Sequence, residues 1–137
     1  MMKRLALLSV VSLMLASTVF APVALAQEPG AIDVQSVTLG PGGSVTATGT
    51  IECIEGYSYN VTVIVRQRTS GNVYNVADVD ASGTCATTGS LAFTATGFSD
   101  RPFHRGPATV ESFNFFCDPS GTSCQNVRGA LETVRIQ

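Results

Sequence analysis

The chain has 137 residues, among them eight Lys and Arg, ten Asp and Glu and four Cys, and its formal net charge at pH 7 is −2. This length suits one domain with its own core. The weakly acidic balance, without a run of cations, argues against nucleic acid as the main partner, because binding to phosphates requires clustered Lys or Arg.

The first 26 residues have the features of a secretory signal peptide. Lys3 and Arg4 give a basic start, an apolar stretch follows to about Phe20, and Ala24-Leu25-Ala26 has the small-x-small pattern of a cleavage site. A membrane anchor is the rival interpretation, but the apolar stretch is short and Pro22 follows it. We therefore expect cleavage before residue 27 and a secreted domain, residues 27–137, with no later segment that spans a membrane. That domain keeps six Arg, no Lys and all ten carboxylates.

The secreted part consists of short segments in which apolar and polar residues alternate, separated by turn residues. Strands are expected at residues 31–39, 44–53, 59–68, 73–80, 90–98, 107–117 and 124–136, with turns at 40–43, 70–72 and 81–83. In the second segment, one face holds Val45, Ala47, Gly49, Ile51 and Cys53, and in the third it holds Tyr59, Val61, Val63 and Val65. This pattern predicts an all-β fold, specifically an immunoglobulin-like β-sandwich of about seven strands. A small closed barrel is the alternative.

The four cysteines predict two disulfides, because an even number in a small exported domain is typical of an oxidised framework. Asp118-Pro119-Ser120-Gly121 is a turn sequence that would bring Cys117 and Cys124 opposite each other in a hairpin. Cys53 is then left for Cys85. A bridge from Cys53 to Cys117, at the separation typical of the inter-sheet disulfide of antibody domains, stays open as an alternative.

The aromatic run before the hairpin suggests a contact surface. Phe113 and Phe115 share one face of the expected strand, and Phe116 lies on the other face beside the disulfide. If the face with Phe113 and Phe115 is the core, Phe116 projects outward beside the disulfide, which suggests a binding surface, but a capped edge or a partly buried ring is the favoured interpretation. The candidate binding surface comprises Phe103, Phe116, Cys117 and Cys124, and Phe98 would join it if the loop at 99–105 folds across the end of the sandwich.

The residues needed for catalysis or for metal binding are sparse. His104 is the only histidine, and no carboxylate is placed to orient it as a general base. Asp78 and Asp80 begin a sequence that matches the start of a calcium loop, but Gly89 stands where the bidentate glutamate is required. We expect no enzymatic activity, no metal and no cofactor.

Several segments resemble a family of small exported actinobacterial proteins without an assigned activity. They are GTIEC, VTVIVRQR, GTC and PFHRGPATVESF, followed by the last two cysteines and a valine-rich strand. The resemblance implies a signal peptide, a β-sandwich and four cysteines in this order. A more distant resemblance is to the neocarzinostatin-type apoproteins, which carry enediyne antibiotics in a cleft of an immunoglobulin-like sandwich. It implies only the Cys117–Cys124 hairpin disulfide, because their other disulfide closes a short loop whereas Cys53 and Cys85 are far apart.

These observations together favour a secreted, non-catalytic binding module. Its ligand would be a small apolar molecule, another protein or a cell-surface polymer, bound through loops and exposed strands. A structural or adhesive protein of the cell envelope is the main alternative, and a secreted inhibitor or an enzyme is less favoured.

Overall fold

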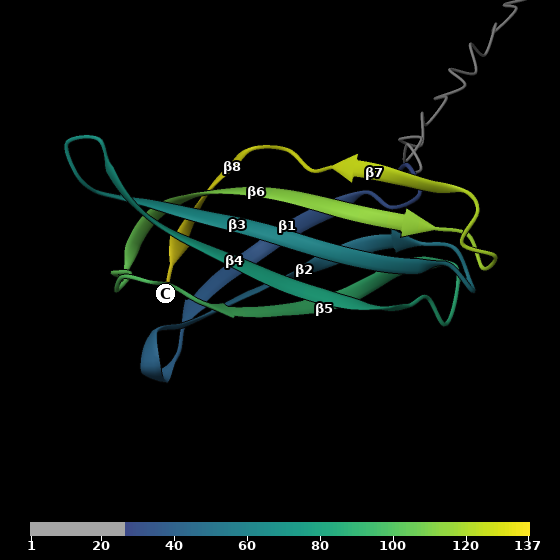
Figure 1. Ribbon diagram of the computed structural model, residues 1–137, viewed down its shortest axis with the longest axis horizontal. Helices are drawn as coiled ribbons and strands as arrows, with labels where there is room; N and C mark the ends of the chain where they lie inside the picture. The colour runs from purple at the N-terminus through teal and green to yellow at the C-terminus, as the bar shows by residue number, and fades with distance from the viewer. Residues whose placement is uncertain (1–26) are drawn as a thin grey trace, which may run out of the picture.

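The computed structural model describes residues 27–137, and the predicted signal peptide lies outside the described residues. In this range the chain is all-β, as the alternating pattern predicts (Figure 1). The strands are β1 (Ile32–Leu39), β2 (Ser44–Cys53), β3 (Ser58–Ser70), β4 (Val73–Thr84), β5 (Gly89–Phe98), β6 (Gly106–Cys117), β7 (Cys124–Arg128) and β8 (Glu132–Ile136), with a single 3-10 turn, η1 (Pro41–Gly43), between β1 and β2.

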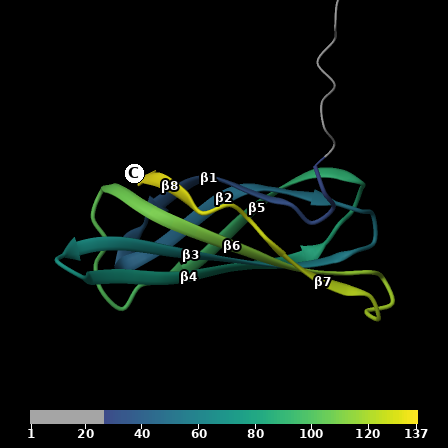
Figure 2. The same cartoon turned by 90° about the horizontal axis from the view of Figure 1, so that it is seen from above.

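The eight strands form one sheet that closes on itself. Its order is β3-β4-β5-β2-β1-β8-β6-β7, and an additional pairing of β3 with β6 closes a barrel-like ring of seven strands. Strand β7 is outside this ring and pairs with the end of β6, beyond the part of β6 that pairs with β8. Seen from above, β1 and β2 lie on one side and β3 and β4 on the other (Figure 2). A closed barrel, the alternative to the predicted sandwich, describes this sheet.

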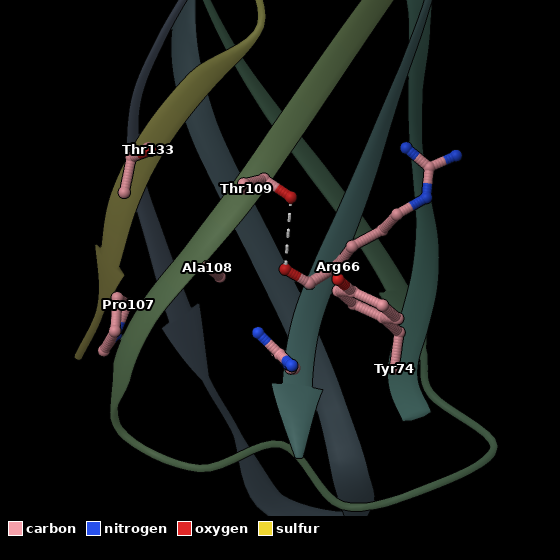
Figure 3. Close-up of a pocket in the computed structure, with 7 residues that line it drawn as sticks. Arg66, Tyr74, Pro107, Ala108, Thr109 and Thr133 are labelled. Carbon is pink, nitrogen blue, oxygen red and sulfur yellow. Dashed lines mark hydrogen bonds between the residues drawn. The ribbon is translucent and has the colours of Figure 1, made fainter. Parts of the chain in front are cut away.

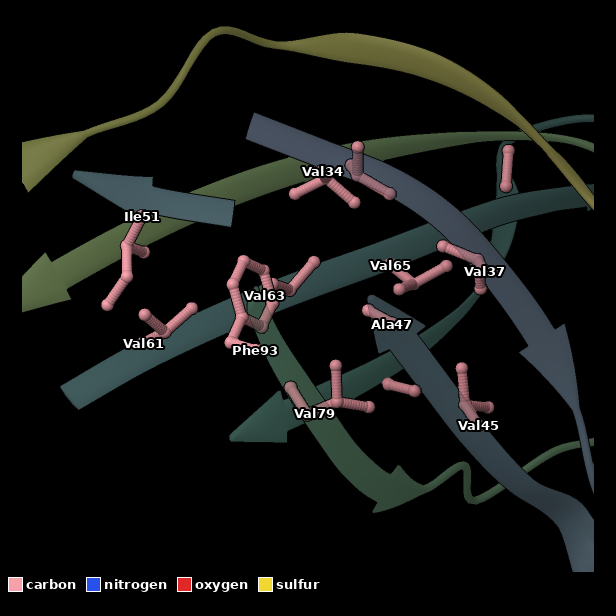
Figure 4. Close-up of a cluster of buried hydrophobic side chains, with 14 of the residues drawn as sticks. Val34, Val37, Val45, Ala47, Ile51, Val61, Val63, Val65, Val79 and Phe93 are labelled. Carbon is pink, nitrogen blue, oxygen red and sulfur yellow. The ribbon is translucent and has the colours of Figure 1, made fainter. Parts of the chain in front are cut away.

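The interior is filled mainly by β-branched side chains, which suit a pleated and half-buried surface. Figure 4 shows valines from β1, β2, β3 and β4 converging around Phe93 of β5. The predicted inward faces of β2 and β3 are confirmed, although Tyr59 at the start of β3 is only partly buried against the core. Buried there are Val45, Ala47, Gly49, Ile51 and Cys53 of β2 and Val61, Val63 and Val65 of β3.

Most predicted strand ends lie within two residues of the observed ones, but two segments differ more. The turn expected at residues 81–83 does not form, because β4 continues to Thr84 and pairs with the start of β3, Gly83 lying opposite Tyr59. The last predicted strand is divided into β7 and β8. At the division Gly129 passes so close to β6 that its N–H donates to the carbonyl of Ser112 (2.9 Å) and a Cβ there would collide with the Ser112 hydroxyl.

The two ends of the molecule differ. Both predicted disulfides are present and lie at one end, the disulfide end, with Cα–Cα distances of 5.6 Å for Cys53–Cys85 and 4.1 Å for Cys117–Cys124. This pairing excludes the alternative bridge from Cys53 to Cys117. The opposite end, which we call the loop end, comprises residues 40–43, 70–73 and 99–105.

Candidate functional site

Phe116 does not project outward, so its place in the candidate binding surface is wrong. Its side chain is only 1% exposed and its ring stacks on Tyr57, with ring centroids 5.0 Å apart, whereas Phe115 is 52% exposed and Phe113 is half-buried. The inward face of β6 is set by Val110, and strict alternation from that residue carries Asn114 and Phe116 into the core. The buried Asn114 amide finds a partner outside the sheet, because Nδ2 donates to the carbonyl of Gly30 (3.1 Å).

The candidate residues Phe103 and Phe116 do not form one surface. Phe103 precedes β6 and Phe116 is near its end, so roughly 35 Å of extended strand separates them. Phe103 is also buried, at 8% exposure, and belongs to the core. The disulfide Cys117–Cys124 is present, but no exposed aromatic ring of the predicted set lies beside it.

The loop at 99–105 does fold across the loop end, where two buried amide side chains hold it. Gln67 of β3 donates to the carbonyl of His104 (2.7 Å) and accepts from the His104 N–H (2.7 Å). Asn75 of β4 donates to the carbonyl of Pro102 (2.5 Å). These bonds satisfy buried polar groups and place Phe103 in the core. The flanking Arg101 and Arg105 side chains are therefore presented from a fixed backbone.

The loop end gathers five of the six arginines of the described chain. Arg66 and Arg68 are near the end of β3, Arg135 lies on β8, and Arg101 and Arg105 lie on the loop. Strand register brings them together, since Arg66 is opposite Thr109 and Arg135 is opposite Pro107 on the two sides of β6. These arginines are separated in the sequence, so the absence of a run of cations there did not reveal that they meet in the fold.

A hollow of about 300 Å³ opens on the outer face of these strands (Figure 3). It is lined by Arg66, Arg68, Tyr74, Pro107, Ala108, Thr109 and Thr133. A neighbouring hollow of about 320 Å³ is lined by Tyr74, Asn75, Val76, Asp100 and Arg101. Tyr74 borders both hollows and its side chain is 49% exposed. The two hollows thus form a surface centred on one aromatic ring with guanidinium groups on both sides.

The arginines of this region differ in their partners. Arg66 Nη1 lies 2.5 Å from Glu111 Oε2, and Arg128 Nη2 lies 3.7 Å from Glu111 Oε1. The hydrogen bond from Arg66 holds the pKa of Glu111 below its ordinary value. Within residues 27–137 these are the only salt bridges. The cations of Arg68 and Arg135 are therefore without a carboxylate partner there.

The Glu111 ion pair predicts a pH dependence of stability. Because the pKa of Glu111 is lower in the folded than in the unfolded chain, its contribution is complete above the ordinary glutamate pKa, about 4.3, and is lost as the pH falls through the folded value. We expect the urea midpoint of the native protein to fall more steeply below this pH than that of Glu111→Gln. Denaturation followed by circular dichroism between pH 3 and 6 measures the two slopes, and parallel curves would contradict the assignment.

The described residues offer little for catalysis. The hydrogen bonds of His104 in the structure are made by its backbone, and no group of three or more His, Cys, Asp or Glu in residues 27–137 is placed to hold a metal ion. The same part of the chain has no helix with the length and apolarity to cross a membrane. Comparison with protein-family models, curated proteins and solved structures gives no match.

Proposed function

We propose that this chain is an exported, disulfide-stabilised binding module without enzymatic activity. Its contact surface is the outer face of β3, β4, β6 and β8 at the loop end. The predicted signal peptide supports export, and so do two disulfides without a free cysteine in the described chain, because such cross-links persist in oxidising compartments. Membership of the exported four-cysteine family that the sequence resembles is part of the proposal.

We further propose that the barrel-like sheet is an immunoglobulin-like sandwich of two layers whose edges are joined by only a few backbone pairs. The pairing of β4 with β5 is limited to Asp80 with Thr96 and an isolated bridge, and that of β1 with β8 to Val37 with Ile136. All other neighbouring strands share five or more paired positions. On this interpretation, β1, β2 and β5 are one layer, β3, β4 and β6 to β8 are the other, and the binding face is the outside of the second layer.

The observation that carries the binding function is the position of Tyr74. A tyrosine supplies a large, stiff contact area with a polar tip, which is why it is enriched at contact surfaces. Here the ring is half exposed on a strand, between two hollows, and Arg68 lies directly opposite it on β3. A contact residue on a strand is held more firmly than one on a loop.

Of the ligands considered from the sequence, we propose a cell-surface polymer, and affinity electrophoresis of the mature, oxidised protein tests this function. The gels contain one of four soluble polysaccharides, of which dextran and pullulan are neutral and polygalacturonate and dextran sulfate are anionic. We expect at least one polymer to retard the native protein, and Tyr74→Ala to weaken that retardation about tenfold, as expected for an aromatic residue central to a contact.

Phe115→Ala is the matched control for this experiment. Phe115 is as exposed as Tyr74 but lies near the disulfide end of β6, so its loss should leave retardation unchanged. Unaltered mobility of the native protein in all four gels would contradict polymer binding. If the two substitutions weakened retardation equally, the proposed location of the contact surface at the loop end would be contradicted.

A structural or adhesive role is the second candidate, and one observation favours it. Phe98 is 74% exposed at the end of β5, and the register that pairs Asp80 with Thr96 and Ala77 with Ser99 places it across from Asp78. Val76 follows on the same face of β4 and is also exposed. An apolar surface of this kind favours self-association.

A further inference from the structure

We propose that the outer face of β3, β4, β6 and β8 around Tyr74, which we call the Tyr74 face, binds an anionic extracellular polysaccharide. Such a polymer carries carboxylate or sulfate groups along its length. This inference rests on the binding function proposed above and names its ligand class. It follows from the order of side chains across the strands, from the charges that remain without partners and from the open form of the two hollows.

Two rows of side chains cross the strands at the loop end. Continuing the β3–β6 register by two residues beyond Arg66 and Thr109 brings Arg68 opposite Pro107, and Pro107 is paired with Arg135. The outer row is therefore Tyr74, Arg68, Pro107 and Arg135, and the inner row is Val76, Arg66, Thr109 and Thr133. Strands are about 4.8 Å apart, so the backbones at Arg68 and Arg135 are separated by roughly 10 Å. That distance is comparable with two linked sugar rings.

The free charge in these rows is positive. Glu111 neutralises Arg66, whereas Arg68 and Arg135 have no carboxylate partner in the described chain. The guanidinium of Arg68 is held from one side, where its Nε donates to the carbonyl of Gly71, and this bond leaves its terminal nitrogens free. A planar guanidinium with free N–H groups suits a carboxylate or a sulfate, which accepts two parallel hydrogen bonds.

The negative net charge of the chain does not cancel this attraction. The carboxylates of Glu52, Glu55 and Asp118 lie at the disulfide end, about a full strand length of β6 away. That length is roughly 35 Å, several times the screening length of about 8 Å at physiological ionic strength. A ligand at the loop end is therefore far from these three carboxylates, and the charges near it are the arginines together with Asp78, Asp100 and the Arg66-bound Glu111.

The uncharged groups favour a sugar polymer over a nucleic acid. The Tyr74 ring offers a face to the C–H groups of a sugar, and the hydroxyls of Thr109 and Thr133 lie in the adjacent row. Two carboxylates lie near the arginines, since Asp100 lines the second hollow together with Arg101, and Glu111 pairs with Arg66. Duplex DNA carries a charge about every 1.7 Å of its axis and would press phosphates against these carboxylates, whereas a polysaccharide with spaced anions would not. Because Tyr74 borders both hollows, a chain can pass from one to the other.

The experiment extends the affinity electrophoresis with an Arg68→Gln/Arg135→Gln double variant. We expect polygalacturonate and dextran sulfate, but not dextran, to retard the native protein, and the double variant to lose about tenfold in affinity for both. Raising the salt from about 50 to 200 mM should weaken retardation of the native protein more than that of the variant. Arg128→Gln removes the same kind of charge from β7, outside the two rows. Arg128 lies 3.7 Å from Glu111, but Arg66 still holds that carboxylate in the variant, so affinity should change by less than about twofold.

The outcomes separate this inference from the proposed function. Retardation by dextran that depends on Tyr74 but not on the two arginines would keep the binding function and overturn the anionic ligand. A loss of about threefold in Arg128→Gln, the share of one charge in a tenfold loss caused by two, would overturn the inference as non-specific charge attraction. Tighter binding to single-stranded poly(dT) than to either anionic polysaccharide would overturn it in favour of nucleic acid. No retardation by any polymer would overturn both.

Discussion

Phe116→Ala is expected to lower the free energy of unfolding by about 3–5 kcal/mol, the cost of removing a buried phenyl ring and leaving a cavity. The ring is almost fully buried, it stacks on Tyr57, and Gly30 lies against its edge. Its loss would therefore loosen the contact between the start of the described chain and the end of β6. Urea denaturation followed by far-ultraviolet circular dichroism measures the change, because the chain contains no tryptophan to report by fluorescence.

Phe115→Ala provides the matched control, since it removes the same ring from the neighbouring position of the same strand. More than half of that side chain is exposed, so we expect a change of less than about 1 kcal/mol. The comparison also tests the orientation of β6 directly. A larger loss at Phe115 than at Phe116 would mean that β6 presents the opposite face to the core.

The orientation of β6 shows why the alternation of apolar and polar residues alone could not predict which face of this strand is buried. In residues 111–117 one face of the strand carries Phe113 and Phe115, and the other carries Phe116 together with Asn114, whose amide argues against burial. The orientation is decided by Ala108 and Val110 earlier in the strand, and it is tolerated because the Asn114 amide bonds to Gly30. That partner lies more than eighty residues away in sequence, so no local pattern could reveal it.

Other elements followed from their residues more directly. Strands β2 and β3 have apolar side chains on one face, so the bounds of β2, those of β3 to within two residues, and the buried valines of both were predictable. Gly83 misled the prediction because a glycine near serine indicates a turn. In the structure it is a packing position, where a Cβ would lie 2.6 Å from the hydroxyl oxygen of Tyr59 on the neighbouring strand. A glycine covered by a cross-strand ring and a glycine in a turn look the same in sequence.

The candidate site was not predictable from a single sequence. Its arginines come from β3, from the loop at 99–105 and from β8, and they meet only because β6 pairs with β3 along one edge and with β8 along the other. The loop is placed by Gln67 and Asn75, two amides that alternation assigns to inward positions without indicating their partners. The cysteine hairpin was predictable because its residues are close in sequence. The arginines at the loop end were not, because only long-range strand register brings them together.

Removing the Cys53–Cys85 disulfide by replacing both residues with alanine is the second large effect that we expect. The bridge joins residues 32 positions apart, and chain entropy alone assigns it about 3.7 kcal/mol. Both sulfur atoms belong to buried residues, so alanine is preferred to serine, which would bury a hydroxyl without a partner. The transition of the double variant in urea should shift to markedly lower concentration than that of the native protein.

The Cys117→Ala/Cys124→Ala variant is the control for this measurement, because its bridge spans only seven positions and the same entropy argument gives about 2.5 kcal/mol. The hairpin is also held by its own bonds, since Asp118 accepts from the Ser120 hydroxyl (2.8 Å) and from the Thr122 N–H (3.1 Å). The loss of unfolding free energy should therefore be smaller than at Cys53–Cys85. A larger loss would show that the hairpin disulfide stabilises more of the domain than its own turn.

The same variant also tests the location of the site. Because this hairpin lies at the opposite end of β6 from Tyr74, we expect the folded variant to retain polysaccharide binding. Loss of binding in a folded variant would instead place the site at the disulfide end.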